Sequence, residues 1–322
     1  MIKQKSHNLT GILFCSLCAL VWGFAFIAQQ KASSDVPTFT FNALRFSLAV
    51  GVIGIFILIN MLIDKKKGTT RIGWNKATFV GGALCGLSLF VANNLQQYAI
   101  AQTTIGKTGF ITALYIVFVP LFNVLLRRRI PTNGKFAIVF AVLGFYIMCT
   151  NGDSGLTYAD ALLLLCAIMF SLQIMFIDIF VDEVDPLKIT FIQFVVASLL
   201  SLPAMAIEGF PPVSAIQANI MPILYVGIMS AGVGFTFQTI GQRYAPPELA
   251  TLIMSLESVI AFIGGGAFFY ERYSPNGVAF LHESYSTKEF VGCIIVLLAV
   301  FLAQISIPHT MLKPNYSKYF ID

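Results

Sequence analysis

The sequence predicts an all-α integral membrane protein in which ten transmembrane helices form two inverted five-helix repeats around a central cavity. Charged residues make up only 11% of the 322 residues and hydrophobic residues 57%, whereas a soluble domain carries roughly a quarter charged residues. The apolar runs are about 20 residues long, a length that spans the hydrocarbon core of a bilayer as a helix. The two halves of the chain also resemble each other weakly.

Five apolar runs in the first half are predicted to be spans, and they are separated by loops of charged or turn-forming residues. The second run ends at DKKKGTTRIGWNK, the fourth at RRRIPTNGK, and the fifth, which is the shortest, at TNGDSGLTYAD. These spans cover residues 11–29, 38–63, 79–100, 104–126 and 136–150.

Five further runs in the second half follow the same rule. The sixth is followed by the acidic loop DEVDP, the seventh by EGFPPVSAIQ, and the ninth by the long loop ERYSPNGVAFLHESYSTKE. These spans cover residues 160–180, 187–207, 222–242, 245–270 and 289–307.

The positions of lysine and arginine predict the orientation, because cytoplasmic loops carry an excess of these residues. With the N-terminus in the cytoplasm, the basic clusters at residues 65–67 and 127–129 fall inside, and ten spans return the C-terminus to the same side. We therefore expect a multi-pass protein of the plasma membrane with both termini cytoplasmic. The net charge of +5 is explained by these loops, so we expect no nucleic-acid partner.

An internal repeat relates the two halves. The stretch LCALVWGFAFI from Leu17 resembles LCAIMFSLQIM from Leu165, and further on Tyr115 falls on Glu257. Chance similarity between apolar segments is the alternative, but the matched points keep their order and nearly constant spacing.

The repeat predicts the domain organisation. An odd number of spans in each half turns the second copy upside down, an arrangement common in secondary transporters, where the solute binds between the copies near the midplane. We expect residues 1–152 to form the first repeat, 153–308 the second, and 309–322 a cytoplasmic tail.

Glu257 is the only charged residue between Leu249 and Tyr270, and it lies near the middle of the ninth span. A carboxylate at that depth costs about 2.5–3.5 kcal/mol on insertion scales. Desolvation favours the neutral form of a carboxyl group, so one interpretation is a site that binds a proton or a solute ammonium group. The other is a structural ion pair or a neutral acid that locks two helices.

Other polar or aromatic side chains inside the spans are candidate solute-binding residues. The guanidinium of Arg45 needs a hydrogen-bond acceptor, and there are three candidates for it: Glu257, a carboxylate of the solute, or carbonyl groups at a helix end. Trp22 lies mid-span, where its ring either packs or holds a cationic group. Tyr115 is a candidate hydrogen-bond donor to Glu257.

Amide side chains in the third and eighth spans complete the set of candidate site residues. In NNLQQY, Asn93 and Gln97 lie on one helical face and Asn94 lies nearby. Because amides are unfavourable against lipid, they either line a cavity or bond helices together. Gln238 is a further candidate in the eighth span.

No enzyme signature is present in the sequence, and we expect a protein that is not an enzyme and needs no cofactor or metal. The Gly-x-Gly at Gly232 and Gly234 lacks the other residues of a phosphate-binding loop. The three histidines are scattered, and the six cysteines lie within apolar runs, which is typical of small buried side chains.

Four stretches carry a resemblance to a known family: ALVWGFAFI, ALRF, QQYAIAQTTIGKTGFITALYIVFVPLF and PPELATLIMSLESVIAFIGGGAFFYER. In this order they resemble the EamA-type branch of the drug/metabolite transporter superfamily. The resemblance implies two inverted five-helix repeats, a cavity lined by spans one to four and six to nine, and peripheral fifth and tenth spans. It also implies transport of small metabolites, amino acids or toxic organic compounds, often outward.

The chain departs from the family pattern at two places. The family commonly has Leu-Glu-Pro in the ninth span, where this chain has Leu256, Glu257 and Ser258. Without the proline, which kinks a helix, we expect a smaller bend. The loop that follows FFYER is longer than is usual in the family.

The sequence thus predicts a secondary active transporter that works by alternating access, with export as the expected direction and Glu257 as the candidate for proton coupling. Its solute would be a small metabolite, an amino acid or an organic cation. The expected partners are this solute, protons and the lipid bilayer, and a homodimer is left open. The alternative is a non-transporting membrane receptor or assembly protein with the same helical fold.

Overall fold

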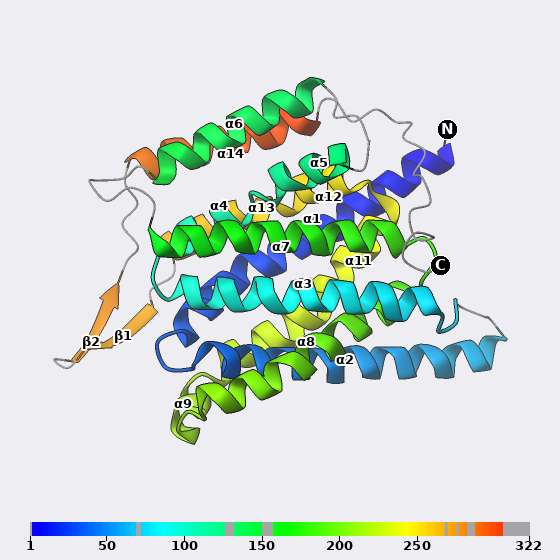
Figure 1. Ribbon diagram of the computed structural model, residues 1–322, viewed down its shortest axis with the longest axis horizontal. Coiled ribbons are helices and arrows are strands. Elements are labelled where there is room, and N and C mark those ends of the chain that lie inside the picture. Colours follow the sequence, from blue (N-terminus) through cyan, green and yellow to red (C-terminus); the bar gives the residue numbers. More distant parts are fainter. Residues whose placement is uncertain are drawn as a thin grey trace.

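The computed structural model describes residues 2–68, 72–125, 132–149, 157–267, 270–274, 277–281 and 287–304. Nearly all of them are helical, and the long helices lie side by side in one bundle (Figure 1). Eight helical segments among the described residues are long and apolar enough to cross a membrane. Large apolar side chains such as Ile55, Leu58 and Leu62 are exposed on the outside of the bundle, as a lipid-facing surface requires.

The described residues of the first half form six helices, several of which begin or end at a residue suited to that position. Asn75 accepts a hydrogen bond from the backbone N–H of Thr78, and Gly68 ends a helix with a φ of 65°, which a residue without Cβ adopts easily. The helices are α1 (Ile2–Ala32), α2 (Thr38–Lys67), α3 (Lys76–Ile100), α4 (Ile105–Thr112), α5 (Tyr115–Leu125) and α6 (Thr132–Cys149).

The second half contains more breaks. Its first helix begins at a capping box, in which Thr157 and Asp160 each accept a backbone N–H of the other. The elements are α7 (Tyr158–Phe180), α8 (Pro186–Glu208), α9 (Val213–Ala218), α10 (Ile220–Leu224), the π-helix η1 (Tyr225–Gly234), α11 (Phe235–Tyr244), α12 (Pro247–Met254), α13 (Leu256–Ala267), the strands β1 (Tyr270–Ser274) and β2 (Gly277–Leu281), and α14 (Thr287–Gln304).

Two predicted spans are interrupted in the middle. The span predicted over residues 104–126 consists of α4 and α5, and the span predicted over 245–270 consists of α12 and α13. The second break falls at Ser255, whose hydroxyl donates to the carbonyl of Leu252. A hydroxyl that bonds a nearby carbonyl competes with the regular helical pattern, so the helix is interrupted without a proline.

The end of the ninth predicted span is placed too far along the chain. Helix α13 ends at Ala267, and Tyr270 already belongs to strand β1, which pairs antiparallel with β2. The sequence YERYS contains two tyrosines, a residue type that is enriched in strands. Part of the long loop therefore forms a β-hairpin.

The bundle has two ends that are named here by their contents. The basic end holds the last turn of α2, with Lys65, Lys66 and Lys67, and the hairpin end is the end beside β1 and β2 (Figure 1). Helices α2 and α8 pack on each other and run antiparallel. This direction is evident from Glu208 at the end of α8, which accepts hydrogen bonds from the backbone N–H groups of Phe39 and Thr40 at the start of α2.

Glycines allow the closest approaches between helices. A Cβ atom on Gly86 of α3 would lie 2.5 Å from the backbone oxygen of Gln193 in α8, and one on Gly23 of α1 would lie 2.5 Å from Ile260 in α13. Helices α6 and α14 pack on each other beside the main bundle (Figure 1). The bundle core is thus formed by the other helices, which position the site.

Candidate functional site

A cavity of about 30 Å³ lies inside the bundle. Its lining residues are all buried, and the most exposed of them, Trp22 and Phe170, are each only 8% exposed. The cavity is therefore nearly closed in this structure. The lining residues are Trp22, Ala25, Phe26, Gln29, Arg45, Gln96, Thr112, Tyr115, Phe170, Ile174, Ser230, Phe235, Gln238 and Glu257.

Glu257 and Tyr115 meet in this cavity where the two broken helices come together. The Tyr115 hydroxyl donates a hydrogen bond of 2.9 Å to Oε1 of Glu257, and both side chains are buried. Each residue lies in the first turn of the half-helix that follows its break. The start of a helix carries partial positive charge, so the break places the Glu257 carboxylate where the backbone stabilises it.

Arg45 lines the same cavity but is not ion-paired with Glu257. Its Nη1 donates to Oε1 of Gln29 and its Nη2 to Oγ of Ser230, each at 3.3 Å. Its Nε is buried and has no hydrogen-bond partner. In the part of the chain that the structure describes, no carboxylate lies within ion-pair distance of Arg45. The guanidinium charge is therefore compensated by neutral acceptors alone.

Aromatic rings form much of the remaining cavity wall. The rings of Trp22 and Phe235 lie 4.6 Å apart between centroids, and the indole N–H of Trp22 donates to the backbone oxygen of Ser230 at 3.3 Å. Phe26 and Phe170 complete this wall. The cavity thus combines a guanidinium and a carboxyl group with an aromatic wall, a combination that occurs in small-molecule sites.

The π-helix η1 places Ser230 at the centre of these contacts. The Ser230 hydroxyl accepts from Arg45, while its carbonyl accepts from Trp22 and from the backbone N–H of Phe235. π-Helical turns are rare and occur frequently at functional sites. The wider winding leaves the Ser230 carbonyl available to a side chain from another helix.

The amides of the third predicted span separate into two groups. Gln96 lines the cavity and donates to the Thr112 hydroxyl at 3.2 Å. Asn93, Asn94 and Gln97 lie outside the lining and donate to backbone carbonyls of Leu89, Phe90 and Gln29. Asn93 and Asn94 thus bond carbonyl groups of their own helix and accept hydrogen bonds from Asn42 of α2, whereas Gln97 bonds α3 to α1.

Gln238 lines the cavity and exchanges two hydrogen bonds with Gln173 of α7. Nε2 of Gln238 donates to Oε1 of Gln173 at 3.0 Å, and Nε2 of Gln173 donates back at 3.2 Å. The same Gln173 nitrogen also donates to Oε1 of Gln193 in α8 at 3.2 Å. We refer to Gln173, Gln193 and Gln238 as the amide triad.

Five of the eight candidate residues from the sequence therefore line one cavity: Trp22, Arg45, Tyr115, Gln238 and Glu257. Sequence reasoning did not single out Gln29, Ser230 or Phe170 as site residues. Phe170 occupies the place of Trp22 in the repeat register set by LCALVWGFAFI and LCAIMFSLQIM, which was a usable signal. Ser230 carries no signal, since a serine within an apolar helix commonly bonds its own backbone.

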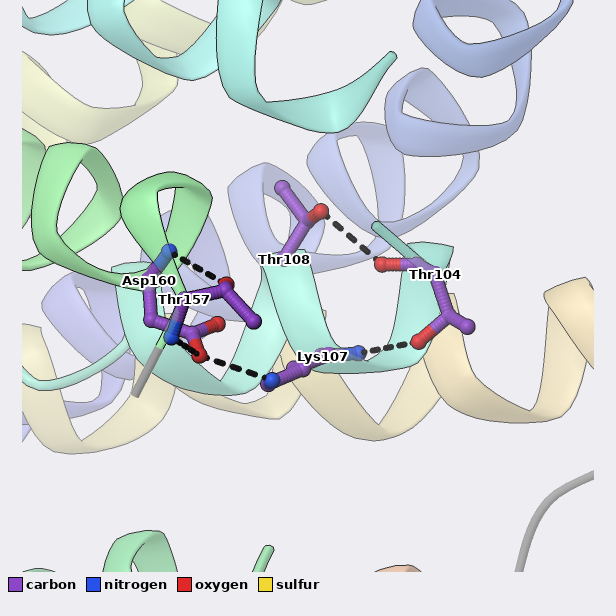
Figure 2. A network of polar contacts seen from close by, with 5 residues as sticks. All are labelled: Thr104, Lys107, Thr108, Thr157 and Asp160. Carbon is purple, nitrogen blue, oxygen red and sulfur yellow. Dashed lines mark hydrogen bonds and ion pairs between the residues drawn. The ribbon is translucent and has the colours of Figure 1, made fainter. Parts of the chain in front are cut away.

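A polar clamp joins the starts of α4 and α7 at the hairpin end (Figure 2). Nζ of Lys107 in α4 and Oδ2 of Asp160 in α7 form an ion pair of 2.8 Å, with the Asp160 side chain fully buried and that of Lys107 14% exposed. Each residue belongs to a helix start: Thr104 caps α4, and Asp160 shares its capping box with Thr157. The clamp ties the starts of α4 and α7 together.

Comparisons with known proteins agree with this architecture. The model of the EamA-like transporter family matches residues 9–150 and again residues 157–304. A protein of Archaeoglobus fulgidus named "uncharacterized transporter" is 26% identical over 312 residues, which cover 95% of this chain and 91% of that protein. The "uncharacterized transporter YoaV" of Bacillus subtilis is 19% identical over 291 residues, which cover 88% and 92%.

A solved crystal structure shares the fold, with a TM-score of 0.64 at 17% identity over 94% of this chain and 97% of the other. The family match extends over both halves of the chain and includes the helices that line the cavity. The chain therefore belongs to the EamA-like transporter family of the drug/metabolite transporter superfamily and is a multi-span membrane protein.

Proposed function

We propose that the protein is a secondary active transporter that moves a small zwitterionic solute of the amino-acid type by alternating access. The observation that carries this proposal is a buried cavity lined by the guanidinium of Arg45 and the carboxyl group of Glu257, which are not paired with each other. A buried charge is costly unless a charge of opposite sign compensates it. A solute with both a carboxylate and an ammonium group supplies both partners.

The lining residues suit such a solute at three places. The guanidinium of Arg45 binds a carboxylate well because its donors are fixed in a plane. The Glu257 carboxylate takes the ammonium group, with the face of Trp22 available as a second attraction for a cation. The apolar wall of Phe26 and Phe170 takes an apolar or aromatic side chain.

The inverted arrangement of two five-helix repeats is part of this proposal. Helix α3 packs on α7 and α11 packs on α1, while α3 packs on α8 and η1 on α2. If α1, α2 and α3 correspond to α7, α8 and the segment of η1 and α11, then the α3–α7 contact corresponds to the α11–α1 contact, and the α3–α8 contact to the η1–α2 contact. A twofold relation between the halves requires this correspondence. Helices α4 and α13 also pack on each other, as do α6 and α14. We propose that α6 and α14 are the fifth and tenth spans.

We propose export across the plasma membrane, with the basic end facing the cytoplasm. The support for this orientation is the cluster of Lys65, Lys66 and Lys67 at the end of α2, since positive residues gather on the cytoplasmic side. The outward direction is proposed from the resemblance to the family alone. A receptor or an assembly protein with the same fold would not need two unpaired charges in a closed cavity. The site therefore favours transport.

A matched set of three solutes tests the proposed solute class. L-Phenylalanine carries both charges, phenethylamine lacks the carboxylate, and 3-phenylpropionate lacks the ammonium group. We expect purified protein in lipid vesicles to move L-phenylalanine faster than either analogue. Arg45→Gln should abolish the preference over phenethylamine, whereas the control Arg243→Gln should retain it, because Arg243 donates to the Val184 carbonyl away from the cavity. Equal rates for all three solutes would disprove the proposed class.

Coupling to protons through Glu257 is tested separately. We expect an imposed pH gradient to drive solute accumulation in vesicles with the wild-type protein, because Glu257 is the only carboxyl group among the residues that line the cavity. Glu257→Gln keeps the size of the side chain but cannot release a proton, so this variant should lose the response to the gradient. A flux that ignores the gradient in both proteins would exclude this coupling.

A further inference from the structure

The amide triad and Arg45 lie at equivalent depths when each depth is counted from the opposite end of the bundle. Arg45 is seven residues into α2, which begins with Thr38, and Gln193 is seven residues into α8, which begins with Pro186. At 1.5 Å per residue, both lie about 10 Å from the start of their helix. Helix α2 begins at the hairpin end, whereas α8 begins at the basic end (Figure 1).

The repeat pattern gives the same correspondence. The register that aligns LCALVWGFAFI with LCAIMFSLQIM places Arg45-Phe46 on Gln193-Phe194. The two phenylalanines lie 5.8 Å apart between ring centroids, next to the cavity. Arg45 and Gln193 therefore hold equivalent places in the two halves, one counted from each end of the bundle.

Gln193 has one hydrogen-bond donor to spare. Its side chain is 1% exposed, its Oε1 accepts from Gln173, and its Nε2 is buried without a hydrogen-bond partner. Buried donors are normally satisfied. Gln173 and Gln238 already satisfy each other through their two hydrogen bonds, so they do not use this donor.

We propose that the amide triad is a second subsite for the solute carboxylate, which the solute occupies when the basic end is open. The inference rests on the proposed function. Gln238 lines the cavity. Gln193, which is connected to Gln238 through Gln173, does not line the cavity in this structure, and its unpartnered Nε2 is the donor that a carboxylate needs. The triad carries no formal charge, so it holds a carboxylate less strongly than Arg45 does. The two ends of the site therefore differ in affinity for the same group.

The triad is not needed to bond these helices together. The hydroxyl of Thr190 in α8 bonds that of Thr239 in α11 at 2.9 Å, and Gln242 of α11 donates to the Ile174 carbonyl of α7 at 2.9 Å. These contacts already connect α7, α8 and α11. Thr190 therefore offers a matched control, one turn from Gln193 on the same helix.

The test measures affinity at each face separately. In vesicles of uniform orientation, the half-saturation concentration of L-phenylalanine is determined with the solute added at the basic end and, separately, at the hairpin end. Gln193→Met removes the amide and keeps the side-chain volume. We expect it to raise the half-saturation concentration at the basic end about tenfold, the effect of one lost hydrogen bond to a carboxylate, and to leave the other face within about twofold.

The controls separate a binding role from a structural one. Thr190→Val breaks an α8–α11 bond and should leave the ratio between the two faces unchanged. Gln193→Glu, a second variant of nearly native size, should raise the ratio further because it repels a carboxylate. An unchanged ratio in both Gln193 variants, or an equal shift in Thr190→Val, would overturn the subsite. If the wild-type protein moves no L-phenylalanine, the proposed function itself fails and the subsite fails with it.

Discussion

The clamp at the hairpin end is predicted to respond unequally to the loss of either partner. Asp160 is fully buried, and of its two oxygens only Oδ2 is bonded, to Lys107 and to the backbone N–H of Thr157. Lys107 is 14% exposed, and its long side chain can turn its ammonium group toward water. The carboxylate therefore depends on its partner more than the ammonium group does.

The magnitudes follow from this difference in burial. Lys107→Met leaves a buried carboxylate without its cation, which costs about 3–5 kcal/mol for a fully buried pair, and we expect the lower end because Lys107 is partly exposed. Asp160→Asn keeps a carbonyl oxygen for the Thr157 N–H and leaves a lysine that reaches water, so we expect a loss of about 1 kcal/mol. The double variant should be more stable than the sum of the two losses predicts.

Equilibrium unfolding in mixed detergent micelles measures these losses, with the fluorescence of the two tryptophans as the signal. The four proteins, wild type, two single variants and the double variant, form a double-mutant cycle. If Asp160→Asn destabilises the protein as much as Lys107→Met does, burial does not control the clamp and the reasoning is refuted.

Three further predictions concern helix packing and the cavity wall. Gly86→Ala should destabilise the protein in the same unfolding assay, because the new Cβ would lie 2.5 Å from a backbone oxygen of α8, whereas Gly51→Ala meets no atom within 4 Å and should be neutral or stabilising. Asn42→Leu removes donors to Asn93 and Asn94 and should lower the free energy of unfolding by about 1–2 kcal/mol, with little change in solute affinity. Trp22→Phe loses the indole bond to η1 and should weaken solute binding about threefold to tenfold in a titration.

The sequence alone was sufficient to predict a helical membrane protein and the positions of several of its long helices. Low charge content and apolar runs of about 20 residues leave no other structure for the chain, since every backbone polar group must be satisfied inside lipid. The spans predicted over residues 38–63, 79–100 and 160–180 lie within α2, α3 and α7. The inverted repeat and the number of spans remain predictions.

Single residues that are unfavourable in lipid were also visible in the sequence. Arg45 and Glu257 stand out because a charge within an apolar run needs a specific environment. Tyr115 was identified through the repeat, and it lies 2.9 Å from Glu257. Neutral residues such as Ser230 and Gln29 gave no comparable signal, because a hydroxyl or amide in a helix is satisfied in many ways.

Only the tertiary structure decided which polar residues face the cavity and which join helices. Gln96 and Gln97 are neighbours in the sequence, yet Gln96 lines the cavity and Gln97 bonds the backbone of α1. The side chains of adjacent helical residues point about 100° apart. The contact that each side chain makes depends on the rotation of the helix about its axis within the bundle.

That rotation is set by long-range packing, such as the close approach at Gly86, and by the breaks at Ser255 and in η1. The local sequence records the chemical type of each side chain, which determined that the chain would be a helical membrane protein with a few buried charges. The meeting of Glu257 with Tyr115, and the separation of Arg45 from both, depend on contacts between residues far apart in the chain. Periodicity within one helix carries no information about such contacts.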